Sequence, residues 1–487
     1  MPLTSVWRAR HPHATDDTTG PAGGPAGGAG AGPAPLEPGT EYDVVVVGGG
    51  LTGLTTASLL ARAGRSVLVL EARHTGDGTT GGSTAKVSAL QGTHYSKIAR
   101  RHPRPVLRRY ADANLEALAW IGRYCAEHGV DHQRRTAWTY ATTERGEQKA
   151  REELDALRMA GIEAADWRTA VALPFATTGA VRLEDQLQVD PLSLLDALAA
   201  DARRHGAVVR EGVRVRGVHG HRPARVRTEA GDVTAQTVVI ATNMPILDRG
   251  GFFARAEPAR SYCVSFRTGA PAVDGMFLSA DQPTRSLRDA PDGDDGALLI
   301  VGGEGHKTGA AVEESERLDR LRRWTHEHYP DAVETHAWSA QDYLPHHALP
   351  FAGPILPGAE GVLVAGGYSK WGMTNAVAAS LAVSGRILGG HQPWASVFEP
   401  WTATELAGLP DSARLNAMVA VEMTEGWVRK LNPVGGGHPP VCTHLGGVLR
   451  WNDAEESWDC PLHGSRFDGR DGSVLEGPAT CALRRVR

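Results

Sequence analysis

The sequence has little cysteine, no long apolar run and no excess of positive charge, and each shortage excludes a class of protein. Five cysteines scattered over 487 residues are too few for a secreted disulfide scaffold, so a reducing, cytoplasmic setting is expected. No run of about 18 apolar residues occurs, so no membrane span is expected. The first ten residues contain no apolar signal region. Lysine and arginine total 51 against 56 acidic residues, which argues against nucleic-acid binding.

Hydrophobic residues make up 41% of the chain, which is enough to bury a sizeable core. Its length suggests roughly three units of about 150 residues each. Residues 1–40 are expected to be a disordered tail, because Gly20–Pro38 is almost entirely Gly, Pro and Ala. Helices are expected over Thr93–Gly129 and over Asp190–His205, where Asp190 is a plausible N-cap. Residues from about Gly390 to Leu409 read as a connector.

The first chemical motif follows the tail directly. Tyr42–Val47 is a short β-branched run typical of a buried parallel strand, and Gly48-x-Gly50-x-x-Gly53 comes immediately after it. This position raises an otherwise weak motif to a strong indication of a dinucleotide site. The next strand ends at Glu71, whose carboxylate is placed to bind a ribose. The motif alone does not distinguish FAD from NAD.

Two later segments, Val238–Thr242 and Val362–Thr374, complete a three-part pattern. With the βαβ unit they resemble the D-amino-acid-oxidase-like family of FAD-dependent oxidoreductases, over roughly Glu41 to Gly390. A second nucleotide motif for NAD(P)H is not indicated. The resemblance implies that FAD is held by residues of the Gly-rich turn, the ribose carboxylate, a loop near residues 78–86 and the start of the last helix. These residues are Gly48, Gly50, Leu51, Thr52, Gly53, Glu71, Ala72, Arg73, Thr79, Thr80, Ser83, Thr84, Ala85, Val213, Thr242, Gly367, Gly372, Met373 and Thr374.

The second chemical motif lies near the C-terminus. Cys442-x-His444 and Cys460-x-x-His463 supply two cysteines and two histidines. This set suits a structural zinc ion, and it equally suits a [2Fe–2S] cluster in which two His hold one iron and two Cys the other. The flanking residues, HLGG and CPLHGSRFD, resemble Rieske domains and favour the cluster.

The Rieske-like segment departs from many members of that group. Gly447 and Leu462 stand where others carry a pair of disulfide-bonded cysteines, so that bridge cannot form. Ser465 keeps a hydroxyl that could bond a cluster sulfur, whereas Phe467 has none. The sequence therefore predicts a potential in the lower half of the Rieske range of roughly −150 to +300 mV. The strands before the first ligand loop look too few, so the cluster is expected to be labile or to lean on the flavin domain.

These resemblances predict an α/β, Rossmann-like FAD-binding domain interleaved with an α+β substrate domain, followed by a small all-β Rieske domain. The expected ranges are FAD-binding parts at about 41–91, 185–254 and 345–390, substrate-binding parts at about 92–184 and 255–344, a linker at 391–411 and the Rieske domain at 412–487. The candidate catalytic residues are Lys86, His306, Asp342 and Lys370. Either lysine could favour an anionic reduced flavin or hold a carboxylate, His306 could act as a base, and Asp342 could position substrate or cap a loop.

The function expected from the resemblance is oxidation of an amino-acid or amine C–N bond at the flavin, with electrons leaving through the cluster to an external one-electron carrier. A dehydrogenase is favoured over an oxidase. Two alternatives remain open. One is a flavin oxidase that uses oxygen and carries a structural or degenerate metal module. The other is a redox sensor or electron-transfer protein without an organic substrate.

Overall fold

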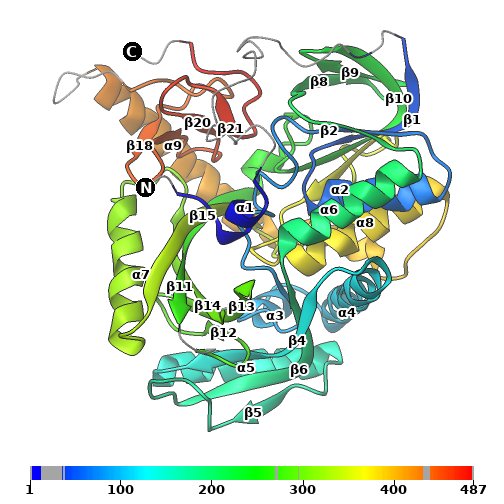
Figure 1. The fold of residues 1–487 in the computed structure, drawn as a ribbon. Coiled ribbons are helices and arrows are strands. Elements are labelled where there is room, and N and C mark those ends of the chain that lie inside the picture. The colour runs from blue at the N-terminus through cyan, green and yellow to red at the C-terminus, as the bar shows by residue number, and fades with distance from the viewer. Residues whose placement is uncertain are drawn as a thin grey trace, which may run out of the picture.

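The computed structural model describes residues 3–12, 36, 39–268, 272–293, 296–431 and 439–484. These residues form three β-sheets with covering helices, and the third, smallest sheet lies at the C-terminal end of the chain (Figure 1). The architecture is an α/β FAD-binding domain interleaved with a substrate domain, plus a small β domain, as the sequence predicts.

The first sheet carries the dinucleotide motif at its centre. Five parallel strands lie in the order β17, β10, β1, β2, β7, with β16 antiparallel at one edge and the β8–β9 hairpin attached to β10. Their bounds are β1 Glu41–Val47, β2 Val67–Leu70, β7 Val208–Arg210, β8 Val215–Gly220, β9 Ala224–Thr228, β10 Gly231–Asn243, β16 Phe351–Pro354 and β17 Val362–Gly366.

The apolar run in β1 is explained by burial on both faces of this sheet. Val44 and Val46 pack into the core under the helices, whereas Val45 and Val47 pack into a second core on the opposite face. All four valines are at most 3% exposed. A strand covered on both sides has no polar face, which is why the sequence shows no alternation there.

The second sheet forms the substrate domain. Its strands lie in the order β15, β11, β14, β13, β12, β4, β6, β3, and β5 pairs with β6. Their bounds are β3 Lys86–Val87, β4 His132–Ala141, β5 Asp166–Arg168, β6 Gly179–Val189, β11 Ala256–Thr268, β12 Met276–Ser279, β13 Arg285–Pro291, β14 Ala297–Lys307 and β15 Val333–Pro345.

Helices cover these two sheets, and α2, α6 and α8 pack together beside the first one (Figure 1). The expected cap of α6 is confirmed, because the Asp190 carboxylate accepts the amides of Leu192 and Ser193. The helical stretch after Thr93 is divided at Pro103 into α3 and α4. The bounds are α2 Leu51–Arg62, α3 His94–Ala99, α4 Arg104–His128, α5 Glu144–Ala160, α6 Pro191–Arg204, α7 Glu314–His328 and α8 Gly372–Leu388.

The C-terminal part contains a helix that the sequence analysis missed. Two short 3-10 turns, η3 (Ala395–Val397) and η4 (Ala403–Gly408), lead into α9 (Leu409–Leu431). Val419 and Met423 of α9 pack against the core of the third sheet. That sheet has four short antiparallel strands, β18 Arg450–Asn452, β19 Ser457–Asp459, β20 Arg466–Asp468 and β21 Val474–Glu476. The range 412–487 is therefore not all β, and a helix leans on the small sheet.

The N-terminal segment also differs from the expected tail. Val6–Arg10 forms a short helix, α1, and Trp7 is only 1% exposed. The Trp7 indole donates a hydrogen bond to the carbonyl of Ser83, in the loop expected to contact the flavin. The expectation of disorder is wrong for this segment, because one buried tryptophan anchors it; most of Gly20–Pro38 lies outside the described residues.

The small domain is fixed to the substrate domain by buried charges. Arg260 on β11 is 1% exposed, and both of its carboxylate partners, Glu455 at 2.6 Å and Glu476 at 3.4 Å, belong to the small domain. Asp453 of the small domain caps α7 by accepting the amides of Glu314 and Ser315. The small domain thus covers and pairs the Arg260 cation and caps the N-terminus of α7.

Within the described residues, no helix combines the length and apolar character needed to cross a bilayer.

We expect Trp7→Ala to lower the free energy of unfolding by about 3 kcal/mol, because it removes a fully buried indole. Urea denaturation of the FAD-loaded protein would measure the change. Trp427→Ala is the control, because Trp427 on α9 is 39% exposed. Equal effects of the two substitutions would show that α1 contributes no stability through its buried side chain.

Candidate functional site

A cavity of about 1330 Å³ lies between the two large sheets and is partly walled by the small domain. Typical small-molecule pockets have volumes of roughly 300–1,000 Å³, so this space accommodates a dinucleotide together with a substrate. Residues of the small domain that line it are Leu475, Glu476, Gly477, Ala479 and Thr480.

The turn between β1 and α2 is shaped as a cradle for a phosphate group. Gly48 has φ +111°, and a Cβ there would lie 2.6 Å from the carbonyl oxygen of Ala241; a Cβ at Gly53 would lie 1.9 Å from the oxygen of Gly48. Helix α2 begins after Gly50 without a capping side chain. The Leu51 amide donates to the Thr80 hydroxyl at 3.2 Å. The first residues of α2 line the cavity, where the positive helix end suits a pyrophosphate.

The predicted ribose carboxylate lies in the cavity. Glu71 accepts hydrogen bonds from the amides of Gly49 at 2.7 Å and Arg73 at 2.9 Å, which fix its orientation. Arg73 and Arg214 line the same end of the cavity. Val213 was also expected to help hold FAD, but its backbone amide donates to the carbonyl of Glu71.

Most of the predicted cofactor residues line the cavity, and five of them do not. Those that line it are Gly48, Gly50, Leu51, Thr52, Glu71, Ala72, Arg73, Thr79, Thr80, Ser83, Thr84, Thr242, Gly372 and Met373. Gly53, Ala85, Val213, Gly367 and Thr374 do not. Thr374 is 1% exposed and its hydroxyl accepts a hydrogen bond from Gln91. Gly367 has φ +73°, and a Cβ there would meet Pro345 at 2.7 Å.

Lys86 lies in the wall of the substrate part of the cavity. Its Nζ donates to the carbonyl of Phe277 and to the hydroxyl of Ser286, both at 2.6 Å. Burial, followed by the charge of Arg288, lowers the pKa of Lys86 to about 7. Lys86 can therefore change its charge near neutral pH.

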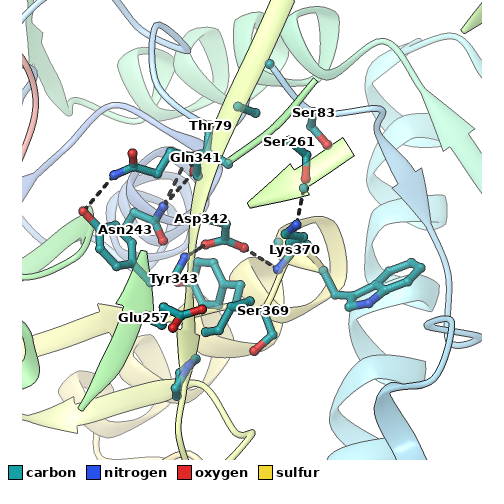
Figure 2. A pocket seen from close by; sticks show the side chains of 18 of the residues that line it. Thr79, Ser83, Asn243, Glu257, Ser261, Gln341, Asp342, Tyr343, Ser369 and Lys370 are labelled. Carbon is teal, nitrogen blue, oxygen red and sulfur yellow. Dashed lines mark hydrogen bonds between the residues drawn. The ribbon is translucent and has the colours of Figure 1, made fainter. Parts of the chain in front are cut away.

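Lys370 and Asp342 form one unit in the same cavity (Figure 2). The Asp342 carboxylate accepts the amides of Lys370 at 2.5 Å and Tyr343 at 2.8 Å, and so holds the turn in which Ser369 and Lys370 have positive φ. The Lys370 Nζ donates to the Ser261 hydroxyl at 2.7 Å, and burial lowers its pKa. Burial raises the pKa of Asp342 to about 6. Its contacts correspond to the loop-capping role.

The structure does not bring His306 into the cavity. Gly302, Gly303 and Gly305 of β14 line the cavity, whereas His306 does not. The His306 ring stacks on Tyr262, and its two nitrogens contact the Tyr262 hydroxyl at 3.0 Å and the Lys307 carbonyl at 2.8 Å. Burial lowers its pKa to about 4. His306 is therefore not placed to act as a base on a substrate.

Several cavity residues carried no sequence signal. Cys263 lines the cavity, and burial raises the pKa of its thiol to about 12, against the charges of Lys86 and Lys370, which lower it. Glu257 contributes a second carboxylate to the cavity. Asn243, at the end of β10, donates to the Thr79 hydroxyl at 3.1 Å. Glu257 and Cys263 lie on β11, which pairs with β15, the strand of Asp342, and local patterns could not reveal this pairing.

The four predicted metal ligands come together in the small domain. The His444 and His463 rings have centroids 5.3 Å apart, and both Nδ1 atoms are buried without a hydrogen-bond partner among the described residues. Cys442 and Cys460 are free and buried. Unpartnered imidazole nitrogens and free thiols are what metal ligation requires.

Two histidines and two cysteines are also the donor set of a Rieske cluster. Among the described residues, no group of three or more His, Cys, Asp or Glu side chains is placed to hold a single metal ion. A tetrahedral zinc site needs four converging donors, whereas a [2Fe–2S] cluster needs two pairs held apart.

The cavity and the ligand loops share a wall. Gln341 on β15 is 1% exposed and donates to the carbonyl of Gly464 at 2.8 Å. The Tyr343 hydroxyl donates to the carbonyls of Gly477 at 3.0 Å and His463 at 3.4 Å. Both side chains also line the cavity, beside Asn243 and Asp342 (Figure 2). Two adjacent β15 side chains therefore connect the expected flavin site with the second ligand loop.

Comparison with protein families identifies both parts. The model of FAD dependent oxidoreductases, DAO, matches residues 43–385, and the Rieske [2Fe-2S] domain model matches residues 439–487. The chain belongs to the DAO family of FAD-dependent oxidoreductases. It binds FAD in this domain and a [2Fe–2S] cluster in its C-terminal Rieske domain.

Similar proteins include chains with one or both of these domains. The Rieske 2Fe-2S iron-sulfur protein YhfW of Bacillus subtilis (strain 168) is 31% identical over 484 residues, covering 93% of this chain and 94% of that protein. The oxidoreductase OrdL of Rhizobium meliloti (strain 1021) is 25% identical and covers 70% of this chain and 81% of OrdL.

Solved structures show the same fold over the DAO domain. Glycine oxidase from Geobacillus kaustophilus superposes with a TM-score of 0.61 at 20% identity, covering 72% of this chain and 96% of the oxidase. L-proline dehydrogenase from P. horikoshii has a TM-score of 0.61 at 18% identity, covering 74% and 98%.

We expect Gly48→Ala to weaken FAD binding by about ten-fold or more, because strain of roughly 1–3 kcal/mol enters the phosphate cradle. The new Cβ must move away from the Ala241 oxygen, which lies 2.6 Å from its ideal position. Fluorescence titration of the apoprotein with FAD would measure the change. Gly64→Ala is the matched control, since Gly64 also has positive φ but open space around its Cβ. Similar losses in both variants would show that backbone conformation, and not the cradle, is responsible.

Lys86 gives a pH prediction for the DAO domain. Because its pKa is about 7, Lys86 is charged below and neutral above that pH. If the charge holds an anionic group, the ratio of wild-type to Lys86→Met rate constants for anaerobic flavin reduction falls by about ten-fold per pH unit above pH 7. The ratio is used because titration of the substrate changes the rate constants of both proteins equally and therefore cancels. A ratio that is constant from pH 6 to 9 would contradict this role.

Proposed function

We propose that this FAD-dependent oxidoreductase is a dehydrogenase for an amino acid or amine, and that its electrons leave one at a time through the Rieske cluster to an external carrier. The observation that carries the proposal is the shared wall: Gln341 and Tyr343 line the cavity and also bind the carbonyls of the second ligand loop. An intramolecular relay requires such proximity.

The substrate class is supported by the solved structures that share the fold. They include a glycine oxidase, an L-proline dehydrogenase and an L-amino acid deaminase. In this chain, Lys86 and Lys370 place positive charge in the substrate part of the cavity, where a carboxylate can bind. Glu257 supplies an acidic group that suits an ammonium.

The proposed reaction removes two electrons and two protons from the amine and leaves an imine, which water hydrolyses. Bound FAD supplies the two-electron acceptor. The role of the chain is to bind and orient the substrate, and Asp342 contributes by holding the Lys370 turn. No strong protein base is required if the amine enters neutral. This is consistent with the position of His306 outside the cavity.

A variant without the cluster tests the relay. We expect Cys460→Ser to retain flavin reduction by substrate under anaerobic conditions, but to reduce cytochrome c at least about ten-fold more slowly than the wild type. Cys481→Ser is the control, because Cys481 is an exposed cysteine of the same domain and is not a predicted ligand. Flavin content and thermal midpoint verify that both variants remain folded.

The other outcomes decide between the alternatives. Equal rates of cytochrome c reduction in the two variants would refute the relay. Oxygen consumption that matches substrate turnover in both variants would favour a flavin oxidase. Flavin that is reduced by a partner protein, but by no member of an amine and amino-acid panel, would favour an electron-transfer protein.

A further inference from the structure

The segment that follows β10 connects the flavin cavity with the cluster ligands. Ala241, Thr242, Asn243 and Ile246 line the cavity. A few residues later the chain reaches both ligand histidines, through Asp248 and through Phe253 in the 3-10 turn η1 (Phe252–Ala254). This segment belongs to the DAO domain and contains no recognised motif.

Asp248 binds the first histidine ligand on the side away from the metal position. Its Oδ1 lies 2.7 Å from Nε2 of His444. A carboxylate only accepts, so Nε2 carries the proton and Nδ1 is left with a free lone pair. That Nδ1 is buried and has no partner among the described residues. The hydrogen bond therefore selects the tautomer that an iron ligand needs.

Phe253 holds both histidine rings in place. Its ring meets His444 at 5.2 Å and 84°, and His463 at 4.7 Å and 67°, both edge to face. The His444 side chain is consequently only 6% exposed, although Asp248 itself is 64% exposed. The flavin domain thus covers the histidine side of the cluster site.

A positively charged residue, Lys307, lies near the second ligand loop. Lys307 ends β14, and Gly309, two residues later, lies against Cys460 and Pro461 of the second ligand loop. The Lys307 Nζ is buried and has no hydrogen-bond partner among the described residues. Lys307 therefore places a positive charge near the second ligand loop, whereas Asp248 places a negative charge on the first.

We infer that the DAO domain supplies the outer shell of the Rieske cluster, with Asp248 as the residue that positions His444 and holds the cluster potential down, and Lys307 as the opposing charge. A carboxylate on the distal nitrogen makes a ligating imidazole a stronger donor and disfavours the added electron. A nearby ammonium favours that electron. The four-stranded domain alone contains neither group, so the potential is set across the domain interface.

The test is a redox titration of the intact, cluster-loaded protein, in which electron paramagnetic resonance measures the fraction of reduced cluster. Asp248→Asn keeps an acceptor oxygen and removes the charge. We expect it to raise the cluster potential by the equivalent of about a ten-fold change in the reduction equilibrium, which is about 59 mV for one electron. Asp155→Asn is the control, because Asp155 is an exposed aspartate on α5, far from the Rieske domain (Figure 1).

Lys307→Gln gives the opposing prediction, a lower cluster potential than the wild type. The nitrogen couplings of the histidine ligands should change in Asp248→Ala, which lacks the acceptor, and not in Asp155→Asn. Loss of the cluster from Asp248→Ala with full FAD content would also support the positioning role. Potentials and couplings that equal those of the wild type in both Asp248 variants would overturn the inference, whatever the substrate proves to be.

Discussion

The arrangement of the molecule depends on one buried cation. Arg260 is almost inaccessible to water, and its carboxylate partners Glu455 and Glu476 come from the other domain. Arg466, also buried, pairs with the same two acids and with Asp459. A buried charge needs partners, and these pairs are made where the Rieske domain packs against the substrate sheet.

That fixed position has consequences for both redox sites. Because the domain is held at β11 and β15, Gly477 and its neighbours become part of the cavity wall, and Tyr343 reaches the carbonyl of His463. The same docking places Asp248 and Phe253 on the cluster histidines. Each domain therefore completes the site of the other, and the small four-stranded sheet does not have to enclose a cluster by itself.

Local sequence patterns predicted the features whose physical cause is local. The valine run of β1, the glycines of the phosphate cradle and the Asp190 cap each follow from steric or hydrogen-bonding rules over a few residues. The same patterns failed where one distant contact decides the outcome. Trp7 orders a segment expected to be tail because it fits under the Ser83 loop. His306, expected as a candidate base, lies outside the cavity lining because its ring stacks on Tyr262.

The sequence by itself determined the two cofactor domains and predicted four metal ligands, because glycine spacing and Cys/His spacing encode short-range geometry. Only the tertiary structure decided which side chains connect the sites. Asp248, Gln341 and Tyr343 occupy ordinary positions in the chain and acquire their roles from residues more than a hundred positions away. Such contacts depend on how the sheets pack and pair, which no local pattern records.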